Sequence, residues 1–134
     1  MKLHDLSVGN NVEYLGFICD VNMIDYSDDK VDLYNGNHFT GIDIDEVEPI
    51  HLTVELLLRM GFVMPFNKEY FTHKSSVNRP FAHLRIAQVE GIDGWHVSVG
   101  DDEQGCIFKR IYHVHQWQNI YYIFTDELIT ITNL

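Results

Sequence analysis

Apolar and polar residues alternate with a period of two along most of residues 1–48, which is the pattern of half-buried β-strands. The alternation predicts short strands at four places: 12–14, 17–23, 31–34 and 39–44. In the second of them four apolar residues share one face: Phe17, Cys19, Val21 and Met23. Asn35-Gly36 separates the last two strands and favours a two-residue hairpin turn with positive φ at both positions. Short strands at this spacing are typical of a small barrel or curled sheet, so we expect an SH3-like small β-barrel over residues 1–49.

A short helix is predicted at Val54–Met60, directly after this region. Thr53 is a good N-cap residue because its hydroxyl can accept a hydrogen bond from the first helical turn. Leu52 and Leu57 occupy the two positions of a hydrophobic staple. Gly61 stands where a residue with left-handed backbone commonly ends a helix.

The rest of the chain predicts an antiparallel meander covered by a helix. The expected strands are 70–73, 82–89, 95–99 and 106–112, joined by connections too short for parallel crossovers. Five apolar residues then recur at helical spacing: Val114, Trp117, Ile120, Tyr121 and Phe124. Residues 128–132 alternate again, as in an edge strand. We therefore expect an α+β protein whose acidic barrel (1–49) and helix-plus-meander part (50–134) form one compact unit.

The charge of the chain is strongly acidic and unevenly distributed. Its 134 residues carry 20 Asp and Glu against 9 Lys and Arg, a net charge of −11, and residues 1–48 account for −9 of it. An acidic surface repels a polyanion, so direct nucleic-acid binding by this half is disfavoured, whereas a basic protein partner is compatible with it. The sequence contains no apolar run of about 18 residues, so no membrane-spanning helix is predicted. The start of the chain lacks a secretory apolar core, and the two cysteines are far apart, so we expect a cytoplasmic protein.

The C-terminal sequence carries a resemblance. His115-Gln116-Trp117-Gln118-Asn119-Ile120-Tyr121, followed by Thr125-Asp126-Glu127-Leu128, resembles small uncharacterised proteins of Bacteroidetes genomes and their prophages. Those proteins end in a His-Gln-Leu-Gln-Asn-Leu-Tyr helix and a Thr-Gly-Glu-Glu-Leu turn, so Trp117 replaces a usual Leu and Asp126 a usual Gly. Residues 5–10 and 48–62 also resemble that group. The resemblance implies a mobile-element context; the group has no established activity or catalytic residues, so it implies no site.

A pair of histidines is a candidate for metal binding, and a cysteine is a candidate for catalysis. His113 and His115 would share one face of a strand and could bind a metal with His83 or His96. The expected change from strand to helix between them favours His115 as a residue that flanks the helix start. Cys106 near a histidine could act as a nucleophile, but it fits a small core residue better.

Carboxylate clusters and missing motifs point away from a cofactor or an enzyme. Asp43, Asp45 and Glu46, like residues 101–103, lack the spacing of a calcium loop and fit a solvent-facing strand and a turn. The chain has no phosphate-binding glycine motif and no hydrolase motif. We therefore expect no cofactor and favour a protein without enzymatic activity.

Polar residues of the predicted last helix are the remaining candidates for binding. Gln116, Gln118 and Asn119 could bind a partner chain or tie the helix to neighbouring backbone, and the second interpretation is favoured. Tyr122 lies outside the apolar stripe and is expected to be exposed.

Three functions follow from these features. The sequence favours a protein-interaction module with an unidentified protein partner. The first alternative is an acidic mimic of nucleic acid that blocks a basic enzyme cleft through carboxylates such as Asp43, Asp45 and Glu46. The second is a small metalloprotein that uses four histidines: His83, His96, His113 and His115.

Overall fold

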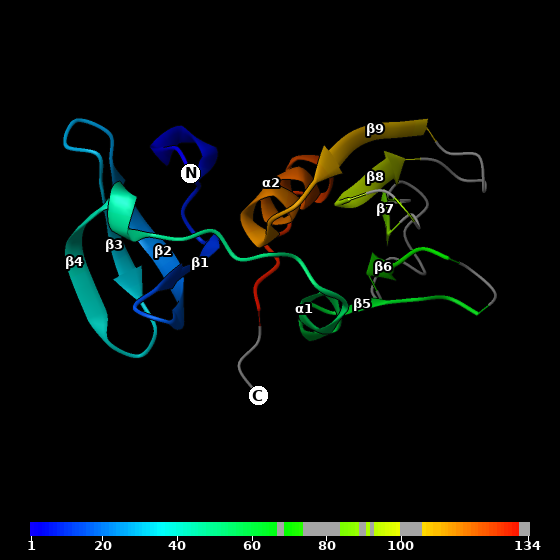
Figure 1. Cartoon of the computed structure of the whole chain (residues 1–134), viewed down its shortest axis with the longest axis horizontal. Coiled ribbons are helices and arrows are strands. Elements are labelled where there is room, and N and C mark those ends of the chain that lie inside the picture. The colour runs from blue at the N-terminus through cyan, green and yellow to red at the C-terminus, as the bar shows by residue number, and fades with distance from the viewer. Residues whose placement is uncertain (67–68, 74–83, 89–90, 92, 100–105, 132–134) are drawn as a thin grey trace.

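The computed structural model describes residues 1–66, 69–73, 84–88, 91, 93–99 and 106–131, with the backbone alone at 106–108 (Figure 1). The fold is α+β, as expected, with antiparallel sheets and the helices α1 (Val54–Arg59) and α2 (Val114–Thr125). Two short 3₁₀ turns, η1 (Leu3–Asp5) and η2 (Ile44–Glu46), accompany the first sheet. Neither α-helix in this part of the chain has the length and apolarity needed to cross a bilayer.

The four strands predicted in the first part form one antiparallel sheet. They are β1 (Asn11–Tyr14), β2 (Phe17–Asp25), β3 (Lys30–Tyr34) and β4 (His38–Asp43), paired in chain order. The sheet is open, with β1 and β4 at its edges, so the closed SH3-like barrel is not confirmed. After η2 the chain returns to β1 at a single bridge, where Glu13 and Glu48 exchange two backbone hydrogen bonds of 2.9 Å.

Only two of the four residues predicted to share the buried face of β2 are buried. Cys19 and Val21 are 1 % exposed, but Phe17 is 59 % and Met23 52 % exposed. The pairing of β2 with β3 shifts register between Val21 and Met23, and such a bulge moves the following side chains to the opposite face. Phe17 starts the strand at the end of the β1–β2 hairpin, outside the core.

The hairpin turn after β3 also differs from the expectation. Tyr34 pairs with His38, so the connection has three residues instead of two. Gly36 has φ +103°, whereas Asn35 does not have a positive φ. The longer loop needs only one left-handed residue, and glycine supplies it.

The second part contains α1, a two-stranded pair and a three-stranded meander. The pair is β5 (Phe62–Val63) with β6 (Thr72–His73); the meander is β7 (Leu84–Gln88), β8 (Trp95–Val99) and β9 (Cys106–Ile111), as predicted. The capped helix is also confirmed, since the Thr53 hydroxyl accepts a hydrogen bond from Leu56 N at 3.2 Å and Gly61 ends the helix at φ +94°.

The buried apolar side chains form two clusters. One is drawn from residues 3–47 and the other from residues 50–131. The second cluster contains Trp117 and Tyr121 of α2 together with Trp95 and Val97 of β8, and Figure 1 shows α2 beside the meander. Ile18 of β2 packs against this second cluster and links the two. The division at residue 49 stays a prediction.

The edge strand expected at 128–132 is wrong as far as the structure describes it. Residues 128–131 have no regular secondary structure, and residue 132 lies outside the description. Ile129 and Ile131 are each 6 % exposed and belong to the core cluster of α2. Side-chain amides of Gln118 and Asn11 take the place of a neighbouring strand in bonding this segment. We call Leu128–Ile131 the tail.

Candidate functional site

Gln118 joins α2, β1 and the tail through one buried amide. Its Oε1 accepts a hydrogen bond from Asn11 N at 2.8 Å, and its Nε2 donates to Asn11 Oδ1 at 2.9 Å and to Ile129 O at 2.8 Å. Asn11 Oδ1 also accepts from Ile131 N at 2.9 Å. Because Gln118 is 0 % exposed, it offers no surface to a partner and has the structural role anticipated for these amides.

The other two polar residues of the helix also bond within the chain. Asn119 Oδ1 accepts from Asn10 Nδ2 at 2.9 Å, and Asn119 Nδ2 donates to Asp5 O at 3.1 Å. Gln116 Oε1 accepts from the backbone N–H groups of Tyr112 and His113 at 2.9 and 3.0 Å, which fixes the start of α2. Asn119 still lines a pocket, described next.

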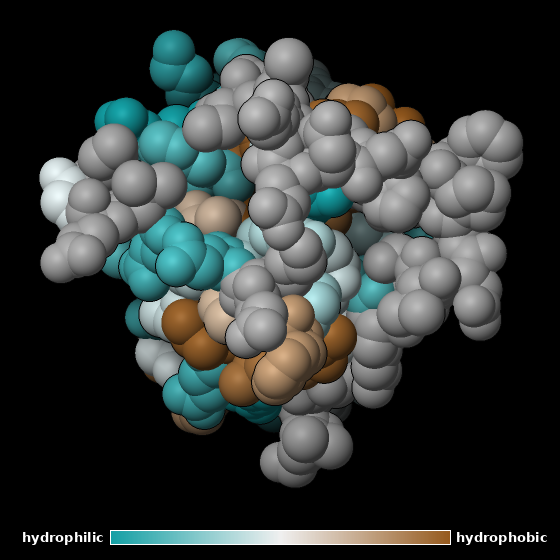
Figure 2. Space-filling model, turned by 90° about the vertical axis from the view of Figure 1, so that its right-hand side faces the viewer, coloured by the Kyte–Doolittle hydropathy of each residue, from teal (hydrophilic) through white to brown (hydrophobic). Residues whose placement is uncertain are grey.

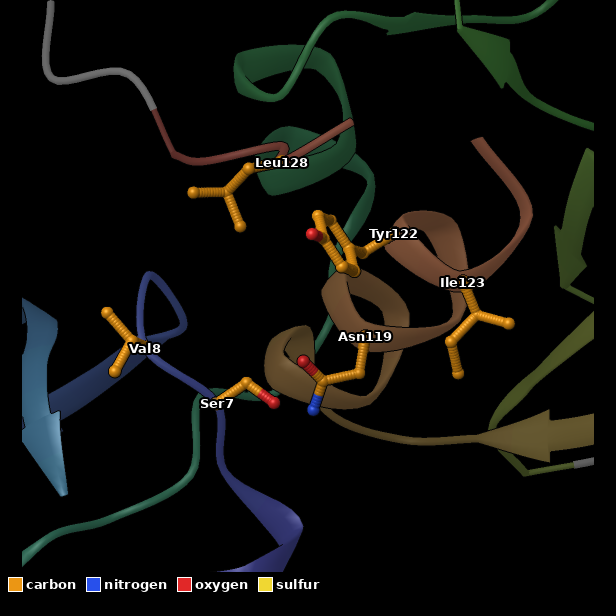
Figure 3. Close-up of a pocket in the computed structure, with 6 residues that line it drawn as sticks. All are labelled: Ser7, Val8, Asn119, Tyr122, Ile123 and Leu128. Atoms are coloured by element: carbon orange, nitrogen blue, oxygen red, sulfur yellow. The ribbon is translucent and has the colours of Figure 1, made fainter. Parts of the chain in front are cut away.

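An apolar pocket lies where the last turn of α2, the segment before β1 and the tail meet. It has a volume of about 380 Å³ and is lined by Ser7, Val8, Asn119, Tyr122, Ile123 and Leu128. Figure 3 shows Val8, Leu128 and Tyr122 arranged around one hollow, with Ser7 and Asn119 on its lower side. We call it the apolar pocket.

The apolar side chains of this pocket are unusually exposed. Val8 is 58 %, Tyr122 49 %, Ile123 77 % and Leu128 52 % exposed. The exposure of Tyr122 was predicted. Phe124 was expected on the buried stripe but is 50 % exposed, because Tyr121 is the last residue of α2 that belongs to the core cluster.

Two backbone conformations place Leu128 at the pocket. Asp126 ends α2 with φ +58°, a left-handed conformation that aspartate tolerates better than most residues, and it turns the chain back toward β1. Gly9 has φ +93°, and a Cβ atom there would lie 2.7 Å from Cδ2 of Leu128. Leu128 therefore packs directly on the glycine backbone.

A second, polar pocket lies at the other end of the tail. Its volume is about 190 Å³, and it is lined by Asn11, Ile18, Asp20, Tyr34, Asn35, Gly36, Thr130 and Ile131. Asp20 Oδ1 accepts a hydrogen bond from Asn11 Nδ2 at 2.6 Å. The lining contains a carboxylate and no basic residue, so its charge favours a cationic group. We call it the polar pocket.

Three histidines gather at the start of α2. The ring centroids of His51 and His113 are 5.3 Å apart, and those of His113 and His115 are 5.7 Å apart in a stacked arrangement. Burial, with a smaller contribution from His113, lowers the pKa of His115 to about 4. Burial and His51 also lower the pKa of His113. These shifts keep the two imidazoles neutral near pH 7.

The metal-site hypothesis gains no support. Within the described ranges no group of three or more His, Cys, Asp or Glu side chains is placed to hold a metal ion. His96 lies on the central meander strand β8, away in sequence from the start of α2. His83, residues 101–103 and the side chain of Cys106 lie outside the description.

The acidic candidates lie at the end of β4 and in η2. Asp43, Asp45 and Glu46 are all exposed, and Asp43 Oδ1 accepts a hydrogen bond from Asp45 N at 3.1 Å as the cap of η2. At the end of β2, hydrogen bonds from Ser27 and Asp28 lower the pKa of the partly exposed Asp25. The arrangement agrees with the solvent-facing strand that the sequence favoured.

A different apolar area lies on the side of the molecule that carries β5 and β6, where Figure 2 shows apolar residues at the surface. Val63 is 38 %, Met64 50 % and Phe66 90 % exposed.

Sequence reasoning found Asn119 and Tyr122 but missed the other four residues of the apolar pocket. Val8 and Ile123 carried one usable signal: Val8 is a large apolar residue in a turn, and Ile123 is one outside the periodic pattern of its helix. Ser7 and Leu128 carried none, since they reach the pocket only through the turn at Asp126. Comparison with protein families, curated proteins and solved structures finds no match to this chain.

Proposed function

We propose that this chain is a non-enzymatic protein-interaction module whose apolar pocket receives an apolar side chain of a partner protein. One observation carries the proposal: four half-exposed or more exposed apolar side chains surround a pocket of about 380 Å³. Water-exposed apolar groups that gather at one place mark sites of protein interaction, since covering them is favourable.

The charge of the chain supports a basic partner. Asp5 lies beside the pocket, because its carbonyl oxygen bonds Asn119, and Asp126 lies between the lining residues Ile123 and Leu128. A second copy of the chain would bring another net charge of −11 to the same surface and be repelled. Opposite charge instead speeds the encounter with a basic protein.

A pull-down with paired variants tests the proposal. The tagged chain, Ile123→Asp and Leu15→Asp are each incubated with lysate of a Bacteroidetes host and washed at low and high salt. Ile123 and Leu15 are 77 % and 70 % exposed, so both substitutions place a charge on an exposed apolar residue, but only the first is at the pocket. We expect Ile123→Asp to lose a partner that Leu15→Asp retains. Equal retention by both variants would overturn the pocket as the interface.

The acidic mimic of nucleic acid is the second candidate, favoured by the exposed Asp43, Asp45 and Glu46 in a half of charge −9. It predicts a basic enzyme that is released at high salt, since salt screens exposed charges. Changing the three residues to Asn, Asn and Gln would release that enzyme, while Ile123→Asp would not.

Two broader attributes accompany this proposal. An SH3-like relationship of the first sheet is supported by the return of the chain after η2 to β1 at Glu13 and Glu48. A cytoplasmic protein of prophage or mobile-element origin is supported by the sequence resemblance of both ends of the chain.

A further inference from the structure

The tail has the alternation of an edge strand but no neighbouring strand within the described residues. Ile129 and Ile131 are buried at 6 % exposure, while Leu128 is 52 % exposed and Thr130 is partly exposed. This alternation places the side chains of Leu128 and Thr130 on one face of an extended segment. The segment thus has the side-chain pattern of an edge strand without a paired strand among the described residues.

The backbone of the tail is bonded along one edge. Ile129 O accepts from Gln118, and Ile131 N donates to Asn11. In an extended chain the N–H and C=O groups of successive residues point to opposite edges, so those of Leu128 and Thr130 point away from this contact. Neither residue makes a backbone hydrogen bond with any other residue that the structure describes.

The two pockets lie at neighbouring positions along this segment. Leu128 lines the apolar pocket, and Thr130 lines the polar pocket that contains Asp20. Residues two apart in an extended chain are separated by about 6.6 Å. An extended peptide beside the tail has the same repeat, so two of its alternate side chains can reach both pockets.

We infer that the tail binds an extended, basic segment of a partner protein by strand addition. The segment places an apolar side chain in the apolar pocket and a Lys or Arg side chain, two residues away, beside Asp20 in the polar pocket. In strand addition the backbone bonds supply affinity and the pockets for alternate side chains supply specificity. The inference rests on the proposed function and names the form and chemistry of the partner.

The polar pocket selects the cation. Asp20 Oδ1 already accepts a hydrogen bond from Asn11 Nδ2, so Oδ2 remains as the acceptor for a cationic group. Further polar atoms in the lining come from Tyr34, Asn35 and Thr130. Charge-assisted hydrogen bonds of this kind are stronger than neutral ones. A second copy of this chain fits poorly, because it would bring a further net charge of −11 to an acidic surface.

Selection of random linear nine-residue peptides on the immobilised full chain tests the pattern. We expect the selected peptides to share an apolar residue and a Lys or Arg two positions away. A consensus without a basic residue, or with helical spacing of its anchors, would overturn the inference.

Synthetic versions of one selected peptide then test strand pairing by fluorescence anisotropy. N-methylation of the amides that face the tail should weaken binding about tenfold or more, while methylation of the alternate amides should leave it nearly unchanged. Equal effects of both methylation patterns would contradict strand addition, whatever the behaviour of protein variants.

Matched protein variants complete the experiment. Thr130→Pro removes the N–H that we assign to the partner, whereas Thr130→Val keeps it, so only the first should lose about tenfold in affinity. Asp20→Asn still accepts from Asn11 Nδ2 and should reduce both the affinity and its salt dependence. If peptide binding depends on Ile123 but not on Thr130, the interaction module stands and strand addition fails. If it depends on neither residue, both proposals fail.

Discussion

The two halves of α2 use their side chains in opposite ways. From Val114 to Tyr121 most side chains are buried, and even the polar Gln118 has every partner supplied by the chain. From Tyr122 to Phe124 three successive residues are half exposed or more and belong to no core cluster. The side chains of this helix thus change from mostly buried to mostly exposed within one turn. Where large apolar residues are exposed and gather around a pocket, a site for another molecule is the natural interpretation.

Removing the buried amide should have the largest effect. Gln118→Leu keeps the volume but leaves Asn11 N and Ile129 O buried without the partners they now have. Each such group costs about 1–3 kcal/mol, so the free energy of unfolding should fall by about 2–6 kcal/mol. Urea unfolding followed by tryptophan fluorescence measures it. A loss below about 1 kcal/mol would show that the hydrogen bonds of Gln118 with Asn11 and Ile129 contribute little to stability.

Acid should weaken the buried start of α2 next. His115 has a pKa of about 4 in the folded chain, against 6.5 as its ordinary value, so between these pH values the unfolded chain binds more protons. Stability from this residue is therefore complete above pH 6.5 and lost as the pH falls to about 4, by at most about 3 kcal/mol. The lowered pKa of His113 acts in the same direction.

The comparison of wild type with His115→Gln isolates this effect from acid titration of the carboxylates. Urea unfolding between pH 7 and 4 should give a shallower pH dependence for the variant. Parallel curves would mean that His115 is protonated equally in the folded and unfolded chains.

Gly9→Ala should have an intermediate effect that reaches the pocket. Gly9 has φ +93°, and the new Cβ would press on Leu128 at 2.7 Å. Left-handed backbone costs an L-residue about 1–2 kcal/mol, while the flexible Leu128 side chain can move aside. We expect that loss of stability in thermal unfolding together with weaker partner binding. Gly36→Ala, where no atom lies within 4 Å of the new Cβ, is the control that strains the backbone without touching the pocket.

Ile123→Ser should have the smallest effect on stability and so sharpen the contrast with Gln118. Because Ile123 is 77 % exposed, the free energy of unfolding should change by less than about 0.5 kcal/mol. Partner retention in the pull-down should nevertheless fall. A stability loss comparable to that of Gln118→Leu would mean that the last turn of α2 is structural after all.

Local signals in the sequence were sufficient for the helices and most strands. Thr53, Gly61 and the alternation of Trp95 and Val97 act within a few residues, and the structure places them as predicted. The open edge of the first sheet and the course of the tail depend on contacts between distant residues. Asn11 and Gln118 are 107 positions apart, and no periodic pattern announces a side-chain amide that replaces a strand. The bulge in β2 interrupts a strand whose apolar and polar residues alternate regularly in the sequence, so the alternation did not predict it.

The amide junction also has a consequence for synthesis of the chain. Asn11 is translated 120 positions before Ile131, which donates a hydrogen bond to its side chain. Until Gln118 and Ile131 have been translated, Asn11 lacks the partners that bond its backbone N–H and its side-chain oxygen in the folded chain, although β1 already pairs with β2. Nascent chains fold their early parts first, so the first sheet can form before the junction that fixes it to the tail. A chain that stops before Gln118 would therefore leave the buried backbone N–H of Asn11 without its partner.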